Sequence, residues 1–324
     1  MSNLEKEPGE VLLSEPVASA SAVELLEPRD VPLGGPRAMQ VRRTLPQRQR
    51  SLIGAWCFVD HYGPDVVSES GGMTVPPHPH TGLQTVSWLF AGDIDHRDSV
   101  GSHATVRPGE LNLMTAGNGI AHSEVSLPQT TVLHGAQLWI ALPEARRFHA
   151  PFFEHYVPDP VDIDGATVHV FIGSLAGRVS TATTFTELVG AQLDIPAGTT
   201  LDLAVDPRFE HGVLLDAGEL TVDGTDVPVA NLAFIDAGRA SLRLRAASDV
   251  RALLIGGTPL GESIVMWWNF IGRSHEEIVR FRDDWQREVI AGENPAGRFG
   301  LVDGYDGAPL PAPELPNVRL RPRD

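Results

Sequence analysis

Two pairs of side chains in the first half of the chain could together bind a metal ion. His78 and His80 stand two residues apart, and so do His122 and Glu124. In an extended strand the side chains at positions i and i+2 point to the same face, so each pair can be directed at one point. Three imidazoles and one carboxylate suit divalent iron, nickel, copper, manganese or zinc better than calcium or magnesium. The spacing therefore indicates a transition-metal site.

The residues around the two pairs weigh against a chance arrangement. The chain has 12 histidines, so spacing alone leaves ordinary core or surface histidines as an equal alternative. Proline, which fixes φ and lacks a donor, stiffens the approach to the first pair at positions 76, 77 and 79. Glycines at 109, 117 and 119 mark the turns before the second pair. These features favour two strands brought together over one site.

A set of ordered motifs accompanies these residues. They are VRRTLP, FVDHYGP, HPHTG, HRDS, PGELNLMTAGNGIAHSE, HGAQLW and HEEI. In this order, and over most of the chain, they resemble the motifs of the pirin family, a branch of the bicupins. In pirins the metal is held by both histidines of HPH and by the His and Glu of H-x-E. The resemblance therefore implies His78, His80, His122 and Glu124 as the ligands.

The resemblance also implies the fold and the metal. We expect an all-β fold of two tandem cupin barrels (double-stranded β-helices, or jelly rolls) and a short C-terminal α-helix. We expect one divalent first-row metal per chain, Fe(II) before nickel, cobalt, manganese, copper or zinc. One departure is Gln84, where many cupins carry Glu, and this change is expected to affect the tuning of the metal rather than its binding.

Four segments follow from these patterns. They are an N-terminal extension (1–25), a metal-binding cupin domain (26–150), a second cupin domain without metal ligands (151–273), and a C-terminal helix and tail (274–324). The second half weakly repeats the first, because LNLMTAG resembles LAFIDAG and AGDI resembles AGEL. Counting without gaps places Ala204, Asp206, Arg243 and Arg245 where the first half has its ligands. We therefore expect the second barrel to be chemically empty.

The remaining histidines of the first half have simpler interpretations. We expect Asp60 and His61 to brace a Gly-Pro turn near the site. His96 and His103 lie between the two ligand pairs, and strand ends or loops are expected for them. His134 precedes a strand and is a candidate for contact with a ligand.

The segment SHEEIVRFRDDWQREVIAG predicts a helix near the C-terminus. Ser274 and Glu277 have the spacing of a capping box, and Gly292 is a suitable stop. An apolar stripe at helical spacing predicts packing against the core; it comprises Ile278, Phe281, Trp285 and Val289.

Charge and composition exclude several classes of function. The net charge of −17 opposes direct binding to nucleic acid, whose phosphates attract Lys and Arg. No apolar run reaches the roughly 18 residues of a membrane span, and no secretory signal core is present. Cys57 is the single cysteine, so it cannot form an intrachain disulfide and is expected to be buried. We expect a cytoplasmic monomer.

The resemblance to pirins leaves three functions open for the site. The first is a dioxygenase that cleaves flavonols such as quercetin, with dioxygen and a small aromatic molecule as substrates. In that function Glu124 would take the proton of the flavonol 3-hydroxyl, and Trp88 or Met114 would hold the flat ring. The second is an iron-binding redox sensor that binds a protein partner, such as a transcription factor or a metabolic enzyme. The third is a site that binds metal and does nothing further.

Overall fold

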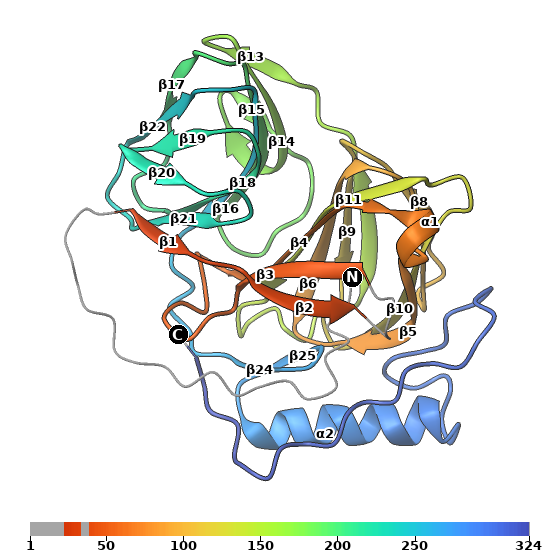
Figure 1. The fold of residues 1–324 in the computed structure, drawn as a ribbon. Helices are drawn as coiled ribbons and strands as arrows, with labels where there is room; N and C mark the ends of the chain where they lie inside the picture. Colours follow the sequence, from red (N-terminus) through yellow and green to blue (C-terminus); the bar gives the residue numbers. More distant parts are fainter. Residues whose placement is uncertain (1–22, 34–38, 324) are drawn as a thin grey trace.

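Two β-barrels lie side by side, and one long helix runs beneath the first of them (Figure 1). The computed structural model describes residues 23–33 and 39–323. The all-β class, the two cupin barrels and the C-terminal helix are confirmed. Most of the predicted N-terminal extension lies outside the described residues.

The first barrel is built from two sheets. One has seven strands in the order β12-β9-β6-β11-β4-β3-β2, and the other has the order β5-β10-β7-β8. The first sheet comprises β2 (Arg29–Leu33), β3 (Met39–Leu45), β4 (Trp56–Val66), β6 (Leu83–Ala91), β9 (Leu111–Thr115), β11 (Val132–Ala141) and β12 (Phe152–Tyr156). The second comprises β5 (Thr74–His80), β7 (Ile94–Asp98), β8 (His103–Val106) and β10 (Ile120–Ser126), and the one-turn helix α1 (Val67–Ser70) follows β4.

The second barrel repeats this plan. Its larger sheet has the order β1-β21-β18-β23-β16-β14-β13 with β15 beside β14, and its smaller sheet has the order β17-β22-β19-β20. The strands of the larger sheet are β1 (Glu24–Leu26), β13 (Val161–Ile163), β14 (Ala166–Leu175), β15 (Arg178–Val179), β16 (Leu188–Ile195), β18 (Glu210–Ala217), β21 (Leu232–Ile235) and β23 (Val250–Gly257). Those of the smaller sheet are β17 (Thr200–Ala204), β19 (Leu220–Val222), β20 (Thr225–Val227) and β22 (Ser241–Ala246).

Strand β1 crosses from the beginning of the chain to the second barrel. It pairs antiparallel with β21, where Leu25 lies opposite Ala233 (Figure 1). The larger sheets of the two barrels also share an apolar layer, in which Trp88 of the first barrel stacks on Phe171 of the second at 4.6 Å between ring centroids. The two barrels are therefore joined by strand β1 and by a common apolar core.

The C-terminal helix forms as its pattern predicts. A small hairpin, β24 (Val265–Trp267) and β25 (Phe270–Gly272), leads into α2 (His275–Trp285), which continues as the π-helical turn η1 (Gln286–Ile290). The Ser274 hydroxyl accepts a hydrogen bond from the Glu277 amide, so this half of the predicted box is confirmed. The Glu277 carboxylate instead accepts from the Arg273 amide at 2.7 Å and pairs with Arg147.

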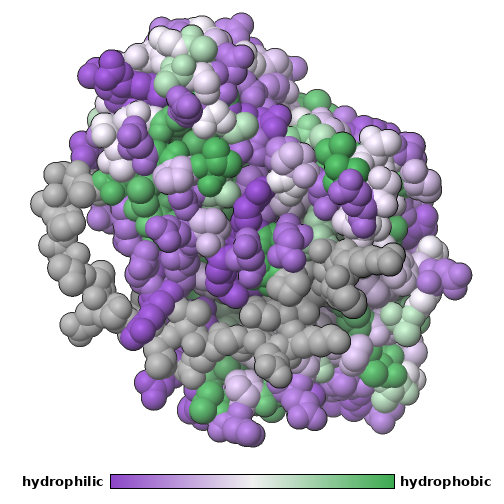
Figure 2. All heavy atoms as spheres, viewed as in Figure 1, coloured by the Kyte–Doolittle hydropathy of each residue, from purple (hydrophilic) through white to green (hydrophobic). Residues whose placement is uncertain are grey.

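The apolar stripe of α2 packs as expected, and the chain after it wraps back along the helix. Ile278, Phe281 and Trp285 are buried in a cluster that also holds Phe299. The Trp285 indole donates to the Leu310 carbonyl at 2.8 Å, which fixes the tail against the helix. Within the described residues, no helix combines the length and apolar composition that a bilayer crossing requires. Figure 2 shows one face of the molecule, where hydrophobic residues form small groups among hydrophilic ones.

Candidate metal centre

The smaller sheet of the first barrel places all four predicted ligands on one face. Strand β10 lies between β5 and β7. His122 on β10 pairs with His78 on β5, and His80 pairs with Ile120 two residues earlier on β10. A β-bulge between His122 and Glu124 shifts the register, and both side chains remain buried. The period-two spacing of each pair therefore has the structural effect that the sequence predicts.

The three histidine rings converge on one point. The Nε2 atoms of His80 and His122 are 3.1 Å apart. The ring centroid of His78 is 4.3 Å from that of His122 and 5.1 Å from that of His80. One ring nitrogen from each of the three lies within 4.8 Å of the other two. Such an arrangement suits coordination of a single ion.

The protonation of these rings also suits a metal. His78 Nδ1 donates to the Pro76 carbonyl at 2.8 Å, while its Nε2 is buried and has no hydrogen-bond partner among the described residues. Burial lowers the pKa of His78 to about 4, and burial likewise lowers the pKa values of His80 and His122 well below the ordinary range. Neutral imidazoles with inward lone pairs are the form that binds metals, so the residues present fit one.

Glu124 lies beside the histidine cluster rather than within it. Its carboxylate can approach His122 and His96 to within 4.8 Å, as a second group of metal-ligating type. The Ser87 hydroxyl lies 3.3 Å from Glu124 Oε1 and 3.0 Å from Gln137 Oε1. One hydroxyl proton cannot serve both acceptors. With the Gln137 amide nitrogen turned toward Ser87, the Ser87 hydroxyl accepts from Gln137 and is free to donate to Glu124. The three side chains then form a continuous series of hydrogen bonds.

The expected position of His96 is wrong. It lies inside β7, opposite Glu124 on β10, and its i+2 neighbour Asp98 lies opposite His122. Both side chains are buried. The missed signal is the H-x-D spacing within HRDS, which places a histidine and a carboxylate on the same strand face. His103, by contrast, begins β8 and is exposed, as predicted for a strand end.

Gln84 and Trp88 point away from the metal face. The Gln84 amide donates to the Thr115 hydroxyl at 2.8 Å and to the Thr183 carbonyl at 2.9 Å. The Trp88 indole donates to Gln192 Oε1 of the second barrel at 2.8 Å. Neither residue contacts the ligand cluster, so the expectation that the change at position 84 affects the tuning of the metal is wrong, and so is the expectation that Trp88 holds a substrate ring. Alternation along β6 directs these side chains to the interface between the barrels instead.

The same side of the larger sheet carries His61 and His134, whose roles near a turn or a ligand are also corrected. Both lie within strands, and their Nε2 atoms are 2.6 and 2.5 Å from the same oxygen, Asp216 Oδ1 of the second barrel. Arg251 donates to the other carboxylate oxygen at 2.6 Å. Asp60, on the opposite face of β4, pairs with buried Arg43 at 2.6 Å. The alternation of strand faces separates the two residues that the sequence suggested act together.

This cluster between the barrels is arranged for protons rather than for a metal. Arg251 Nη2 faces His134 Nδ1 at 3.4 Å, so Nδ1 is the acceptor. The proton of His134 is then on Nε2, which donates a hydrogen bond to Asp216. Burial alone would raise the pKa of Asp216, but hydrogen bonds from His134 and His61 outweigh it and hold that pKa far below its usual range. The adjacent guanidinium further opposes a cation. The cluster links the two barrels by hydrogen bonds.

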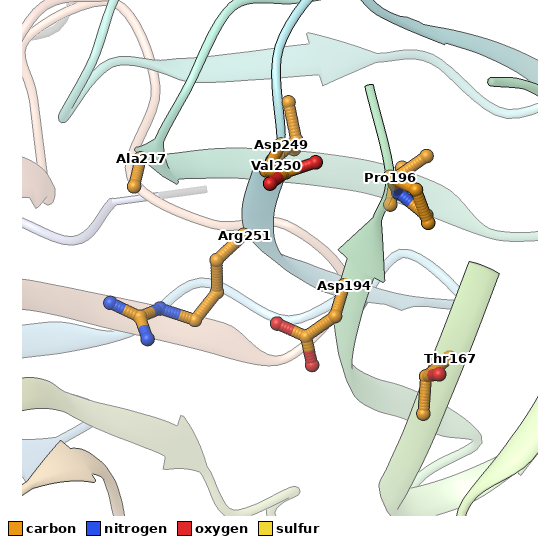
Figure 3. Close-up of a pocket in the computed structure, with 8 residues that line it drawn as sticks. Thr167, Asp194, Pro196, Ala217, Asp249, Val250 and Arg251 are labelled. Carbon is orange, nitrogen blue, oxygen red and sulfur yellow. The ribbon is translucent and has the colours of Figure 1, made fainter. Parts of the chain in front are cut away.

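A cavity of about 460 Å³ lies away from the metal face, on the second barrel. Figure 3 shows the Arg251 side chain of β23 pointing away from Thr167 and Pro196, with Asp194 between Arg251 and Thr167. None of the predicted ligands lines it. The cavity therefore adjoins the cluster between the barrels and contributes nothing to the metal chemistry.

The second barrel presents leucines where the first presents histidines. On β17 and β22 the buried positions are Leu201, Leu203, Leu242, Leu244 and Ala246. Arg243 points outward and pairs with exposed Asp202 at 2.7 Å. The ungapped count to Arg243 and Arg245 therefore missed the interior positions by one residue. Within the described residues no candidate group of ligands lies wholly in this barrel, and the expectation that the barrel is chemically empty stays a prediction.

Known proteins are similar to this chain in sequence and in fold. The family described as Pirin matches residues 38–140, and the Pirin C-terminal cupin domain matches residues 190–291. A Pseudomonas aeruginosa protein provisionally named quercetin 2,3-dioxygenase is 45% identical over 289 residues, 89% of each chain. A crystal structure of quercetin 2,3-dioxygenase from Acinetobacter baumannii superimposes with a TM-score of 0.86 at 37% identity, covering 93% of this chain and 97% of that one.

A bacterial pirin from Escherichia coli, solved in complex with nickel(II), shares the fold with a TM-score of 0.57 at 18% identity. It covers 74% of this chain and 100% of its own. The matches to both barrels, the identity along most of the length and the histidine-bearing face of the first barrel agree. The chain belongs to the pirin family.

Proposed function

We propose that this protein is a metal-dependent oxidoreductase that cleaves flavonols such as quercetin with dioxygen. One observation supports it most. Three neutral imidazoles converge on one point, with Glu124 next to His122 on the same strand face. The chain also resembles, at 45% and 37% identity, proteins named as quercetin 2,3-dioxygenases.

The metal would be held by His78, His80, His122 and Glu124. We propose Fe(II), while the nickel complex of the Escherichia coli pirin supports nickel as an alternative ion for this ligand set. When bound, a divalent metal supplies Lewis acidity that lowers the pKa of a flavonol 3-hydroxyl.

We propose that Glu124 receives the hydroxyl proton. It is buried and lies at the edge of the histidine cluster, where a carboxylate can act both as ligand and as base. Ser87, supported by Gln137, donates to Oε1 and restrains the rotation of the carboxylate.

The apolar part of the barrel interior would exclude water and contact the flat ring. Trp139 lies edge-on to His80 with 5.1 Å between ring centroids, and Phe58 stacks on Trp139 at 4.0 Å. Met114 lies opposite Thr85 in the register of β9 and β6, and it belongs to the same cluster as Trp139. Met114 thus remains a candidate for contact with the substrate ring.

A redox-sensing regulator is the second candidate function. The observation that favours it is the complete burial of the four side chains, each with no exposed surface. The same four residues would hold the metal, which would supply a change of oxidation state that alters the surface presented to a protein partner, with no substrate bound. This candidate predicts metal binding without turnover.

Flavonol turnover separates the two candidates. Purified protein is loaded with Fe(II) or Ni(II), its metal content is measured, and the loss of quercetin and the uptake of oxygen are followed. The enzyme should exceed an equal concentration of free metal and yield carbon monoxide. Turnover equal to that of free metal, at full metal occupancy, would refute the dioxygenase and favour the regulator.

A further inference from the structure

His122 presents its two ring nitrogens to two different groups. Nε2 faces His80 Nε2 at 3.1 Å, on the side where the histidine rings converge. Nδ1 faces His96 Nδ1 at 3.4 Å. Because the neutral imidazole carries one proton, the atom that faces His96 decides whether the other atom has a lone pair for a metal.

His96 is itself fixed by two contacts. Its ring stacks on Phe153 with 4.8 Å between centroids and 27° between planes. Its Nε2 is 3.4 Å from Asp98 Oδ2. This distance and the 3.4 Å between His96 Nδ1 and His122 Nδ1 are both long for hydrogen bonds. The side chains of His96 and Asp98 are almost fully buried.

Asp98 is anchored at the end of β7. Its Oδ1 accepts the backbone amides of Val100 at 3.0 Å and Ser102 at 2.8 Å. With Oδ1 held by these two backbone N–H donors, Oδ2 is the carboxylate oxygen left to face His96 as an acceptor. Oδ2 therefore accepts a hydrogen bond from His96 Nε2–H and does not donate one.

The positions of the protons follow from this anchor. If Asp98 accepts, His96 Nε2 carries the proton and His96 Nδ1 has a lone pair. His122 Nδ1 must then be the donor between the two rings, so His122 Nε2 is unprotonated. A ligating histidine commonly donates its remote N–H to a carboxylate or carbonyl; here a second histidine relays that function from Asp98.

We propose that His96 and Asp98 are positioning residues that fix the tautomer and the ring orientation of His122 and thereby hold its Nε2 toward the metal. The proposal rests on the metal site of the proposed function. It concerns ion binding only and needs no flavonol chemistry.

A matched pair of variants tests His96. In His96→Asn the amide oxygen is as many bonds from Cα as the ring Nδ1, so it can accept from His122, whereas His96→Leu has the same size and no acceptor. Both lose the contact with Phe153, and the comparison cancels that loss. The measurements are Co²⁺ and Ni²⁺ affinity by competition with a chelator and the visible absorption bands of bound Co²⁺. His96→Leu should bind roughly 10–100-fold more weakly than wild type, and His96→Asn should recover much of this loss.

A second pair tests the direction of the proton chain. In Asp98→Asn the amide oxygen can still accept from Val100 and Ser102, but the amide nitrogen then faces His96 Nε2 as a donor. The chain of protons inverts, so a proton occupies His122 Nε2 and blocks the metal, as when a triad aspartate is replaced by asparagine. The control is Asp95→Asn, also on β7, whose carboxylate contacts Arg97 and exposed His103. Asp98→Asn should weaken Co²⁺ binding about tenfold or more, and Asp95→Asn should not.

The outcomes are distinguishable. Equal loss of affinity in His96→Asn and His96→Leu, with a change in the number or intensity of the Co²⁺ bands, would make His96 a direct ligand and overturn the positioning role. Unchanged affinity in His96→Leu and Asp98→Asn would also overturn it. A wild-type protein that binds no Co²⁺ or Ni²⁺ would instead refute the metal site itself. Thermal unfolding of each metal-free variant shows whether the fold is retained.

Discussion

His78 and His122 lie directly opposite each other in the register of β5 and β10, and their ring centroids are 4.3 Å apart. The two residues are 44 positions apart in the sequence (122 − 78), so only the pairing of the strands brings the rings together. In the second barrel the matching strands, β17 and β22, bring Leu201 opposite Leu244. The same backbone arrangement therefore supports a site in one barrel and a packed apolar core in the other.

The metal should be lost with His122 and not with a histidine outside the cluster. We expect about one equivalent of metal per chain in wild type, because the candidate ligands form one converging set. His122→Ala removes the central ligand and should abolish stable binding. Elemental analysis of protein from iron-supplemented cells is the measurement, and His103→Ala, at an exposed position on β8, is the control. Full occupancy in His122→Ala would place the metal elsewhere.

The stability of the protein should depend on pH through His211 in the second barrel. The side chain is buried, both ring nitrogens lack hydrogen-bond partners among the described residues, and burial lowers its pKa to about 4 from 6.5. Between these values the unfolded chain binds a proton that the folded chain refuses, so stability is present above pH 6.5 and is lost as pH falls toward 4.

His211→Leu should remove this contribution. Between pH 6 and pH 5 the free energy of unfolding should fall by about 1 kcal/mol less in the variant than in wild type. Urea denaturation of metal-free protein at pH 5, 6 and 8 measures the difference. Parallel pH dependence in the two proteins over this range would contradict the assignment.

Asp216 should be important for the stability of the link between the barrels. Asp216→Asn removes a buried charge that accepts from His61, His134 and Arg251, and should cost about 2 kcal/mol or more. The comparison is Asp202→Asn, which breaks an exposed pair with Arg243 and should leave the unfolding midpoint unchanged. Chemical denaturation followed by tryptophan fluorescence reports both. Equal midpoints for the two variants would show that the cluster contributes nothing.

The protein should not bind duplex DNA directly. Its net charge of −17 repels a polyanion, and α2, the longest helix of the described residues, packs its apolar stripe against the core. A gel shift with mixed-sequence duplexes at about 0.15 M salt should show no complex. Nanomolar binding under these conditions, the range of specific DNA-binding proteins, would contradict the prediction.

The sequence predicted the contacts that depend on local spacing. The pairs at 78/80 and 122/124 follow from the period of a strand, and the α2 stripe and the Ser274 cap follow from the period and the ends of a helix. Asp216 could not be predicted as the partner of His61, because 155 residues separate them and only the packing of the barrels joins them. The role of Trp88 depended on which face of β6 is interior, and a single sequence does not fix this.

Glu124 tests the central claim most directly. Glu124→Gln keeps the size of the side chain and one weak oxygen ligand, but it removes the base and a negative charge. The three imidazoles should retain metal, while activity should fall about 10²-fold or more, the scale of losing a general base. The measurement is oxygen uptake with quercetin by wild type and Glu124→Gln at equal, assayed metal content. Dioxygenase function predicts wild-type turnover well above that of the variant and of free metal; equal rates for wild type and Glu124→Gln would contradict it.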